Sequence, residues 1–160
     1  MAATLVASTV NSDDLQTFAG AKIYISASLP ATDDQAGYEA LTFTEIGGAT
    51  DSPTTGISAN NVTYDLLSSG FTSNRKGQKS YGTGTVNYAE VPADAGQVIV
   101  QAAVLSNNNY AFAISDQNGN FKYLKGIVQS APSNGGTADT IQAITMTLQW
   151  NSVPVPVAAP

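Results

Sequence analysis

The sequence predicts a mainly β domain of the α+β class, an antiparallel β-sandwich or partly closed barrel with one flanking α-helix at about residues 92–106. Several short segments alternate apolar and polar residues with a period of two, which is typical of half-buried strands. Clusters of Gly, Asn, Ser and Pro separate them and indicate turns. One longer segment spaces its apolar residues as a helix does. Two long polar segments, 47–61 and 68–80, lack either period and are expected to be loops.

The helix candidate lies within Val91–Asn109. Pro92 suits a first helical turn, and Asp94 places a carboxylate near the helix N-terminus. The face expected to cover the sheet follows the spacing i, i+3, i+4, i+7 and i+10, and it consists of Ala95, Val98, Ile99, Ala102 and Leu105. A buried strand at 97–100 is the alternative, because Val-Ile-Val is β-branched and Gly96 weakens a helix by about 0.5–1 kcal/mol relative to Ala.

The expected strands are residues 21–29, 38–46, 62–66, 81–88, 110–115, 121–129 and 140–150. The sequence Asn118-Gly119 joins two of them and is a strong signal for a hairpin. In the last strand one face is expected to hold Gln142, Ile144, Met146, Leu148 and Trp150. Residues 30–37 are expected to form a turn.

The length of 160 residues suits one domain, with an arm at 1–19, a core at 20–150 and an extended tail at 151–160. Charged residues make up 11% of the chain, against about 25% in ordinary soluble proteins. Thr, Ser, Asn and Gln together number 53. A polar surface with so little charge predicts that much of it meets other subunits. An extracellular β domain rich in Thr, Ser and Asn is the alternative.

Several kinds of chemistry are disfavoured by composition. A net charge of −6 argues against a protein that binds by neutralising many phosphates. The absence of His and Cys removes the commonest general base, zinc ligands and thiol nucleophiles, and no cofactor is expected. The N-terminus is a poor signal peptide, and no segment is expected to span a membrane.

The remaining candidates for chemistry are carboxylates in turn-like segments. The pairs Asp13–Asp14 and Asp33–Asp34 are interpreted as solvated turn residues and not as an acid and base pair. Asp116, Asn118 and Asn120 match the first three ligand positions of a calcium loop, but the later positions of that motif do not fit. A hairpin turn is therefore predicted there, with no metal and no catalytic site.

Arg75, Lys76 and Lys79 are half of the six basic residues and form one local cluster. A solvated polar loop is the default interpretation. The functional alternative is a basic protrusion that docks onto an acidic patch of an identical neighbour, a head-to-tail contact that builds rings or filaments.

Three motifs occur in order at 40–47 (Ala-Leu-Thr-Phe-Thr-Glu-Ile-Gly), 92–97 (Pro-Ala-Asp-Ala-Gly-Gln) and 133–139 (Ser-Asn-Gly-Gly-Thr-Ala-Asp). With their spacing, the chain from about Lys22 to Trp150 resembles the major tail tube proteins of long flexible-tailed (siphovirus) bacteriophages. The arm before Lys22 and the tail after Trp150 are not covered by the resemblance.

The resemblance implies a β-sandwich or barrel with a flanking helix, related in fold to the ring protein of type VI secretion systems. Six copies would form a ring, and stacked rings would form a tube through which double-stranded DNA passes without specific binding. The implied partners are further copies, tail tip or baseplate proteins, a tail terminator protein and, during assembly, a tape measure protein. The implied location is the virion tail, assembled in the cytoplasm of the host bacterium.

Within such a tube, the two long loops and the arm are expected to form the stacking interface, with Arg75, Lys76 and Lys79 in the ring-stacking loop. Sheet edges and the helix would form the ring interface, and polar strand faces would line the lumen. Val100 and Val104 lie off the expected core face of the helix, so a neighbouring subunit is expected to cover them. The alternative function is a monomeric carbohydrate- or cell-surface-binding β module that uses aromatics such as Tyr81, Tyr88 and Trp150.

Overall fold

The computed structural model describes residues 15–68 and 70–159, which form ten strands and two helices. The strands are β1 (Lys22–Ser26), β2 (Thr44–Glu45), β3 (Ser58–Leu66), β4 (Phe71–Ser80), β5 (Thr83–Ala89), β6 (Tyr110–Ser115), β7 (Phe121–Ser130), β8 (Ser133–Asn134), β9 (Ala143–Trp150) and β10 (Val155–Val157). The helices are α1 (Gln35–Glu39) and α2 (Ala95–Val104). All strand pairs are antiparallel.

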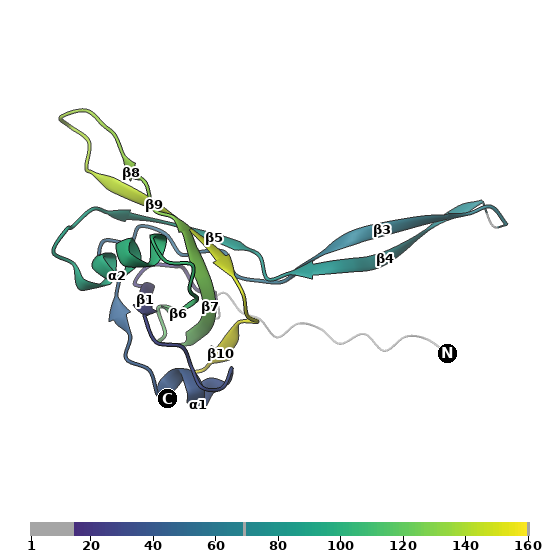
Figure 1. The fold of residues 1–160 in the computed structure, drawn as a ribbon, viewed down its shortest axis with the longest axis horizontal. Coiled ribbons are helices and arrows are strands. Elements are labelled where there is room, and N and C mark those ends of the chain that lie inside the picture. The colour runs from purple at the N-terminus through teal and green to yellow at the C-terminus, as the bar shows by residue number, and fades with distance from the viewer. Residues whose placement is uncertain (1–14, 69, 160) are drawn as a thin grey trace.

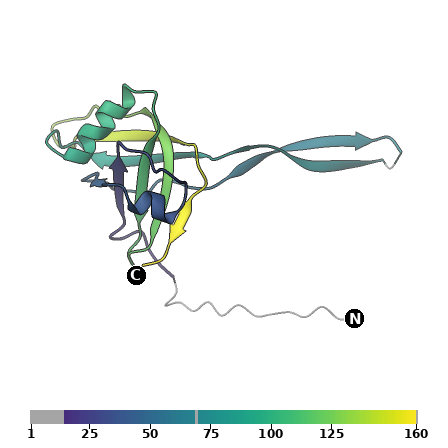
Figure 2. The same cartoon turned by 60° about the horizontal axis from the view of Figure 1, so that its bottom comes forward.

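Eight strands form one main sheet in the order β2-β1-β6-β7-β9-β5, with β10 paired to β7 and β8 paired to β9. The sheet curls into a partly closed barrel, with α2 at one side and α1 near β10 (Figure 1). Strands β3 and β4 form a separate two-stranded sheet that projects from the barrel, as Figure 2 shows from a second direction. The predicted class, a mainly β antiparallel fold with a flanking helix, is confirmed.

The main core lies on the face of the curled sheet that packs against α2. The alternation predicted for the last strand is confirmed, since Ile144, Met146, Leu148 and Trp150 are all buried. Gln142 precedes β9 and is exposed. The Trp150 ring meets Phe112 edge to face, and its indole N–H donates to the backbone carbonyl of Thr54 at 2.9 Å.

The opposite face of the sheet carries a smaller aromatic cluster beneath α1 and β10. Here the prediction of a strand at 38–46 is wrong, because 35–39 form α1 and only 44–45 form β2. The Asp34 carboxylate caps α1 by accepting the backbone N–H of Gly37 at 2.9 Å. Tyr38 of α1 is fully buried and stacks on Tyr123 with ring centroids 5.4 Å apart.

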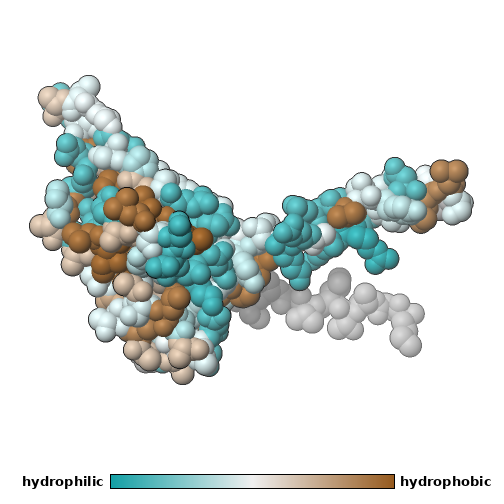
Figure 3. All heavy atoms as spheres, viewed as in Figure 1, coloured by the Kyte–Doolittle hydropathy of each residue, from teal (hydrophilic) through white to brown (hydrophobic). Residues whose placement is uncertain are grey.

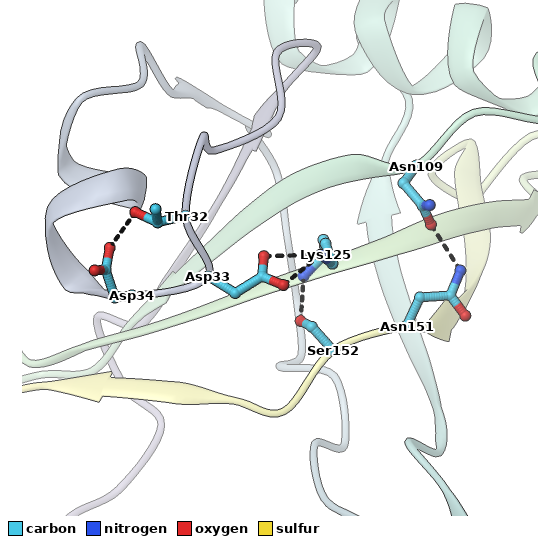
Figure 4. Close-up of polar contacts among 7 residues, drawn as sticks. All are labelled: Thr32, Asp33, Asp34, Asn109, Lys125, Asn151 and Ser152. Carbon is cyan, nitrogen blue, oxygen red and sulfur yellow. Dashed lines mark hydrogen bonds and ion pairs between the residues drawn. The ribbon is translucent and has the colours of Figure 1, made fainter.

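Polar contacts fix α1 and the chain end to β7 (Figure 4). The Lys125 ammonium forms an ion pair with Asp33, in the turn before α1, and the backbone N–H of Lys125 donates to the Ser152 hydroxyl at 2.9 Å. The Asn151 amide donates to the Asn109 side chain at 2.6 Å. Asn151 and Ser152 of the predicted extended tail thus contact the barrel, and Val155–Val157 join the sheet as β10.

Helix α2 is shorter than the predicted 92–106, and it presents a different face to the core. Asp94 caps it by accepting the backbone N–H of Gln97 at 2.9 Å. The Gln97 side chain is buried and donates to the carbonyls of Gly47 and Ala89, at 3.0 and 2.9 Å. Gly96 lies so close to the Glu45 carbonyl that a Cβ would stand 2.1 Å from its oxygen. These two residues set the rotation of the helix.

That rotation makes the predicted core face wrong at every position except Ile99. The buried residues of α2 are Gly96, Gln97, Val100 and Ala103, and Ile99 and Val104 pack partly against the core. The predicted core residues Ala95, Val98, Ala102 and Leu105 are exposed. Apolar residues surround this helix, so their spacing alone could not select a face; the close approach at Gly96 and the hydrogen bonds of Gln97 do so.

The predicted loops at 47–61 and 68–80 are also corrected. Residues 58–61 of the first segment belong to β3 and residues 71–80 of the second form β4, whereas 47–57 remain a loop as predicted. That loop is fixed to β5, because the Asp51 carboxylate accepts the backbone N–H of Asn87 at 2.6 Å and its side-chain amide at 2.7 Å. Residues 1–14 of the predicted arm lie outside the described residues, and 15–19 contain no helix or strand.

Candidate assembly surfaces

Of the carboxylates singled out in the sequence, Asp33, Asp34 and Asp116 have structural roles. In the β6–β7 turn the Asp116 carboxylate accepts the backbone N–H groups of Asn118 and Asn120, each at 2.9 Å, and the Asn120 amide at 2.7 Å. These hydrogen bonds, with the one from the Asn120 side chain foremost, lower the pKa of Asp116. The predicted hairpin turn is confirmed. Asp13 and Asp14 lie outside the described residues.

Within residues 15–68 and 70–159, no group of three or more acidic side chains is placed to hold a metal ion. Over the same ranges no helix has the length and apolar character needed to cross a membrane.

The aromatic residues of the alternative binding function do not form a surface site. Tyr88 and Trp150 belong to the main core, and only Tyr81 of the three is exposed. The Tyr88 hydroxyl is buried with no hydrogen-bond partner among the described residues, and burial raises the pKa of Tyr88 to about 12. A carbohydrate cannot stack on rings that solvent does not reach, so Tyr88 and Trp150 cannot form the surface site that the alternative binding function needs.

The most prominent surface is the β3–β4 hairpin, which extends from the barrel as a long two-stranded ribbon (Figure 1). Its register runs from Ser58 opposite Ser80 at the root to Leu66 opposite Phe71 at the tip, with a bulge between Ala59 and Asn61. Every residue of β3 is exposed. Among the described residues, β3 therefore has no covering layer of the kind that packs on each face of the main sheet.

The two faces of the hairpin differ in chemistry. One face holds Val62, Tyr64 and Leu66, and Tyr64 is 67% exposed. The opposite face is polar, with a hydrogen bond of 2.9 Å between the amides of Asn61 and Asn74 and another of 2.6 Å from Thr72 to Asp65. This alternation is that of a strand pair with one face buried, although nothing in the described part of the chain covers it.

The basic cluster lies on β4 of this hairpin, near its middle and root, and is divided between its surfaces. Arg75 pairs with Val62 and shares the apolar face, whereas Lys76 pairs with Asn61 on the polar face. Lys76 and Lys79 together line a groove of about 430 Å³ beside residues 57–61. Among the described residues none of the three cations forms an ion pair, since the two ion pairs there are Lys22–Glu45 and Lys125–Asp33.

Charge is distributed unevenly between the hairpin and the rest of the molecule. Residues 57–80 contain three basic residues and one acidic residue, Asp65, whereas the rest of the sequence contains three basic and eleven acidic residues. The hairpin is thus a basic protrusion on an acidic body. Surfaces of opposite charge attract each other.

The outer face of α2 is a second apolar surface. Val98 is 55% exposed and Leu105 is 91% exposed, with Ala95 and Ala102 beside them. Figure 3 shows apolar side chains gathered on the barrel near α2 and again at the far end of the hairpin. Val100, expected to meet a neighbouring subunit, is fully buried, so it cannot belong to an interface.

The fold is found in proteins of known structure. No protein-family profile matches the sequence, and no curated protein matches it. A chain of the SPP1 tail tube superposes with a TM-score of 0.63 at 14% identity, covering 87% of this chain and 77% of that one. A chain from the C6-symmetric tail of the empty gene transfer agent (GTA) particle gives 0.60 at 13% identity, covering 94% and 100%.

A chain from the extended sheath-tube complex of an extracellular contractile injection system, PVC, gives a TM-score of 0.60 at 13% identity, covering 95% of this chain and 100% of that one. At such identities the likeness establishes the fold. This chain is therefore folded like the chains of these tail and tube assemblies.

Proposed function

We propose that this chain is a structural subunit of a phage tail tube, in which rings of six copies stack around a channel for genome passage. The observation that carries the proposal is the β3–β4 hairpin, whose apolar face has no cover in the described part of the chain although the body has the fold of tail tube subunits. The C6 symmetry of the GTA tail supports the ring of six.

The hairpin supplies the contact between rings. An isolated two-stranded ribbon is marginally stable in water, so an apolar face such as Val62 with Tyr64 gains most from a partner surface. The cations Arg75, Lys76 and Lys79 on β4 favour the acidic body of another copy. Because the hairpin and the body are different surfaces, this contact is heterologous and propagates along a stack.

The outer face of α2 supplies a contact within the ring. We expect Val98 and Leu105 to form this contact in place of Val100 and Val104. The rotation of the helix turns Val100 into the core and leaves Val104 half-buried. Burying two such side chains against a neighbour contributes about 2–3 kcal/mol in area terms before the cost of ordering.

The channel function needs no catalytic group and no cofactor, only a wall that does not hold DNA. The net charge of −6 suits such a wall, because attraction to phosphates would slow ejection. In this role the chain acts as one tail tube domain of a virion tail assembled in the host cytoplasm. Tail tip or baseplate proteins, a tail terminator protein and a tape measure protein are its further expected partners.

Electron microscopy of the purified full-length chain tests the proposal. At high protein concentration we expect rings, stacked rings or hollow tubes of uniform diameter. A particle that stays strictly monomeric at every concentration, by microscopy and by light scattering, would overturn it.

A further inference from the structure

A groove of about 840 Å³ opens at the end of the main sheet where β6 passes into β7. Its apolar lining comes from widely separated parts of the sequence, and it includes Phe18, Pro53, Ile114, Phe121, Pro156 and Val157. A hollow of this size accommodates several large side chains, and its apolar lining favours an apolar occupant. Asp116 and Lys122 also line it, so its own charge is balanced.

The hairpin ends in an apolar knob. Leu67, in the turn between the two strands, is fully exposed, and Phe71 on the other side of the turn is 78% exposed. Figure 3 shows an apolar patch at the far end of the hairpin, away from the barrel. Large apolar side chains at the end of a protrusion are typical of a segment that inserts into a partner.

The knob and the groove lie at opposite ends of the hairpin. Residues 52–55, which line the groove, come just before the root of β3 at Ser58. The nine residues of β3 span roughly 30 Å from root to tip at about 3.3 Å per residue. Because the hairpin points away from the barrel in both views, the knob cannot enter the groove of its own chain (Figures 1 and 2). A second copy displaced by about the length of the hairpin would present its groove to the knob.

Charge favours the same arrangement. When the knob of one copy reaches the body of another, the basic residues of β4 follow behind it toward a body whose described residues outside 57–80 include nine acidic and three basic side chains. The attraction acts at the scale of the whole body, because the groove itself carries one carboxylate and one ammonium group.

We propose that the knob formed by Leu67 with Phe71 of one copy inserts into the groove of a second copy and packs onto the paired residues Phe121 of β7 and Val157 of β10. The proposal deepens the tail tube function and rests on it, since it names the surface that receives the hairpin. Each copy carries one knob and one groove, so the contact has a direction and leaves a free knob and a free groove at the two ends of a stack.

Disulfide cross-linking tests this contact without background, because the chain has no Cys. The test variant is Leu67→Cys with Ala158→Cys, which places one thiol on the knob and one on an exposed groove residue. The matched control is Leu67→Cys with Ser28→Cys. Strand β1 begins beside the groove, where Lys22 pairs with Ser115, and Ser28 is an exposed residue that follows the other end of this strand. Leu67→Cys alone controls for contacts between knobs, which can give no species larger than a dimer.

After mild oxidation of the assembled full-length protein, we expect the test variant to give a ladder of dimers, trimers and longer species on a non-reducing gel. The Ser28 control should give no ladder. Separately, Leu67→Asp should raise the protein concentration needed for assembly by about tenfold or more, with Leu67→Met as the conservative control.

Other outcomes overturn the proposal in distinguishable ways. Tubes that form normally while Leu67→Cys with Ala158→Cys gives no ladder would refute the docking and leave the tube function standing. If Leu5→Cys with Ala158→Cys gave a ladder and the test pair did not, the N-terminal segment, and not the knob, would occupy the groove. Failure of the unmodified chain to assemble at any concentration would refute both the docking and the tube function.

Discussion

The barrel and the β3–β4 hairpin are built on the same alternation of apolar and polar residues, but only the barrel covers its apolar faces. In β9 every second residue is buried, whereas in β3 Val62 and Tyr64 alternate with polar residues and stay exposed. The barrel thus completes its core within the chain. The hairpin has the pattern of a half-buried sheet, and in the proposed tube its second layer comes from another copy of the chain.

The largest effect separates the two regions by stability. Phe112→Ala removes a fully buried ring that packs on Trp150, so it should destabilise the monomer by about 3–5 kcal/mol. Tyr64→Ala on the hairpin removes an exposed ring and should change monomer stability by less than about 0.5 kcal/mol. Urea unfolding of dilute monomer measures both. Equal losses would mean that the hairpin ring is packed within its own chain.

A smaller effect tests how the barrel sets the face of α2. Gly96→Ala would place a Cβ against the Glu45 carbonyl, and we expect a loss of about 1–3 kcal/mol as the helix shifts outward. Gly135→Ala, where a Cβ meets nothing within 4 Å, is the matched control and should be nearly neutral. Thermal unfolding compares them. A neutral Gly96→Ala would show that this contact does not hold the helix in place.

Reversing charge on the hairpin should act on assembly and leave the barrel unchanged. Arg75→Glu with Lys76→Glu should shorten the tubes and raise the unassembled concentration by about tenfold at low salt. Added salt should shrink the difference, because it screens the attraction between exposed charges. Lys22→Glu on the barrel is the control. Unchanged tube lengths in the double variant would remove these cations from the stacking contact.

The smallest effect is a pH dependence of the barrel. Hydrogen bonds lower the pKa of Asp34 and Asp116 below the ordinary value of 3.8, so each carboxylate stabilises the fold above that value. The contribution is lost as pH falls through the lowered pKa. We therefore expect Asp116→Asn to lower the Tm at pH 7 more than at pH 3, as followed by circular dichroism of the monomer. A constant difference across this range would contradict the stated role of the carboxylate.

Much of the barrel could be predicted from sequence because its signals are local. The alternation that ends at Trp150 and the Asn118-Gly119 turn each fix an element without reference to the rest of the chain. The strand expected at 38–46 was wrong at its start, because the Asp34 side chain caps a short helix there.

The candidate surfaces were harder to predict because they depend on distant parts of the chain. The face of α2 is set by Gly96 against Glu45 and by Gln97 against Ala89, contacts that no spacing rule contains. The sequence of β4 favours a loop, because its residues are mostly polar and it has Lys and Asn at positions where a packed strand has Val or Ile. The basic residues were found, but their division between two faces follows from the register.

In the proposed tube, another copy of the chain covers the hairpin. The most direct measurement is electron microscopy of the full-length chain and of Val62→Ser with Tyr64→Ser at matched concentrations, together with the Tm of each dilute monomer. We expect tubes or ring stacks from the unmodified chain, and from the variant the same Tm but no stacks. A variant with unchanged Tm that forms tubes of the same length and abundance would contradict it.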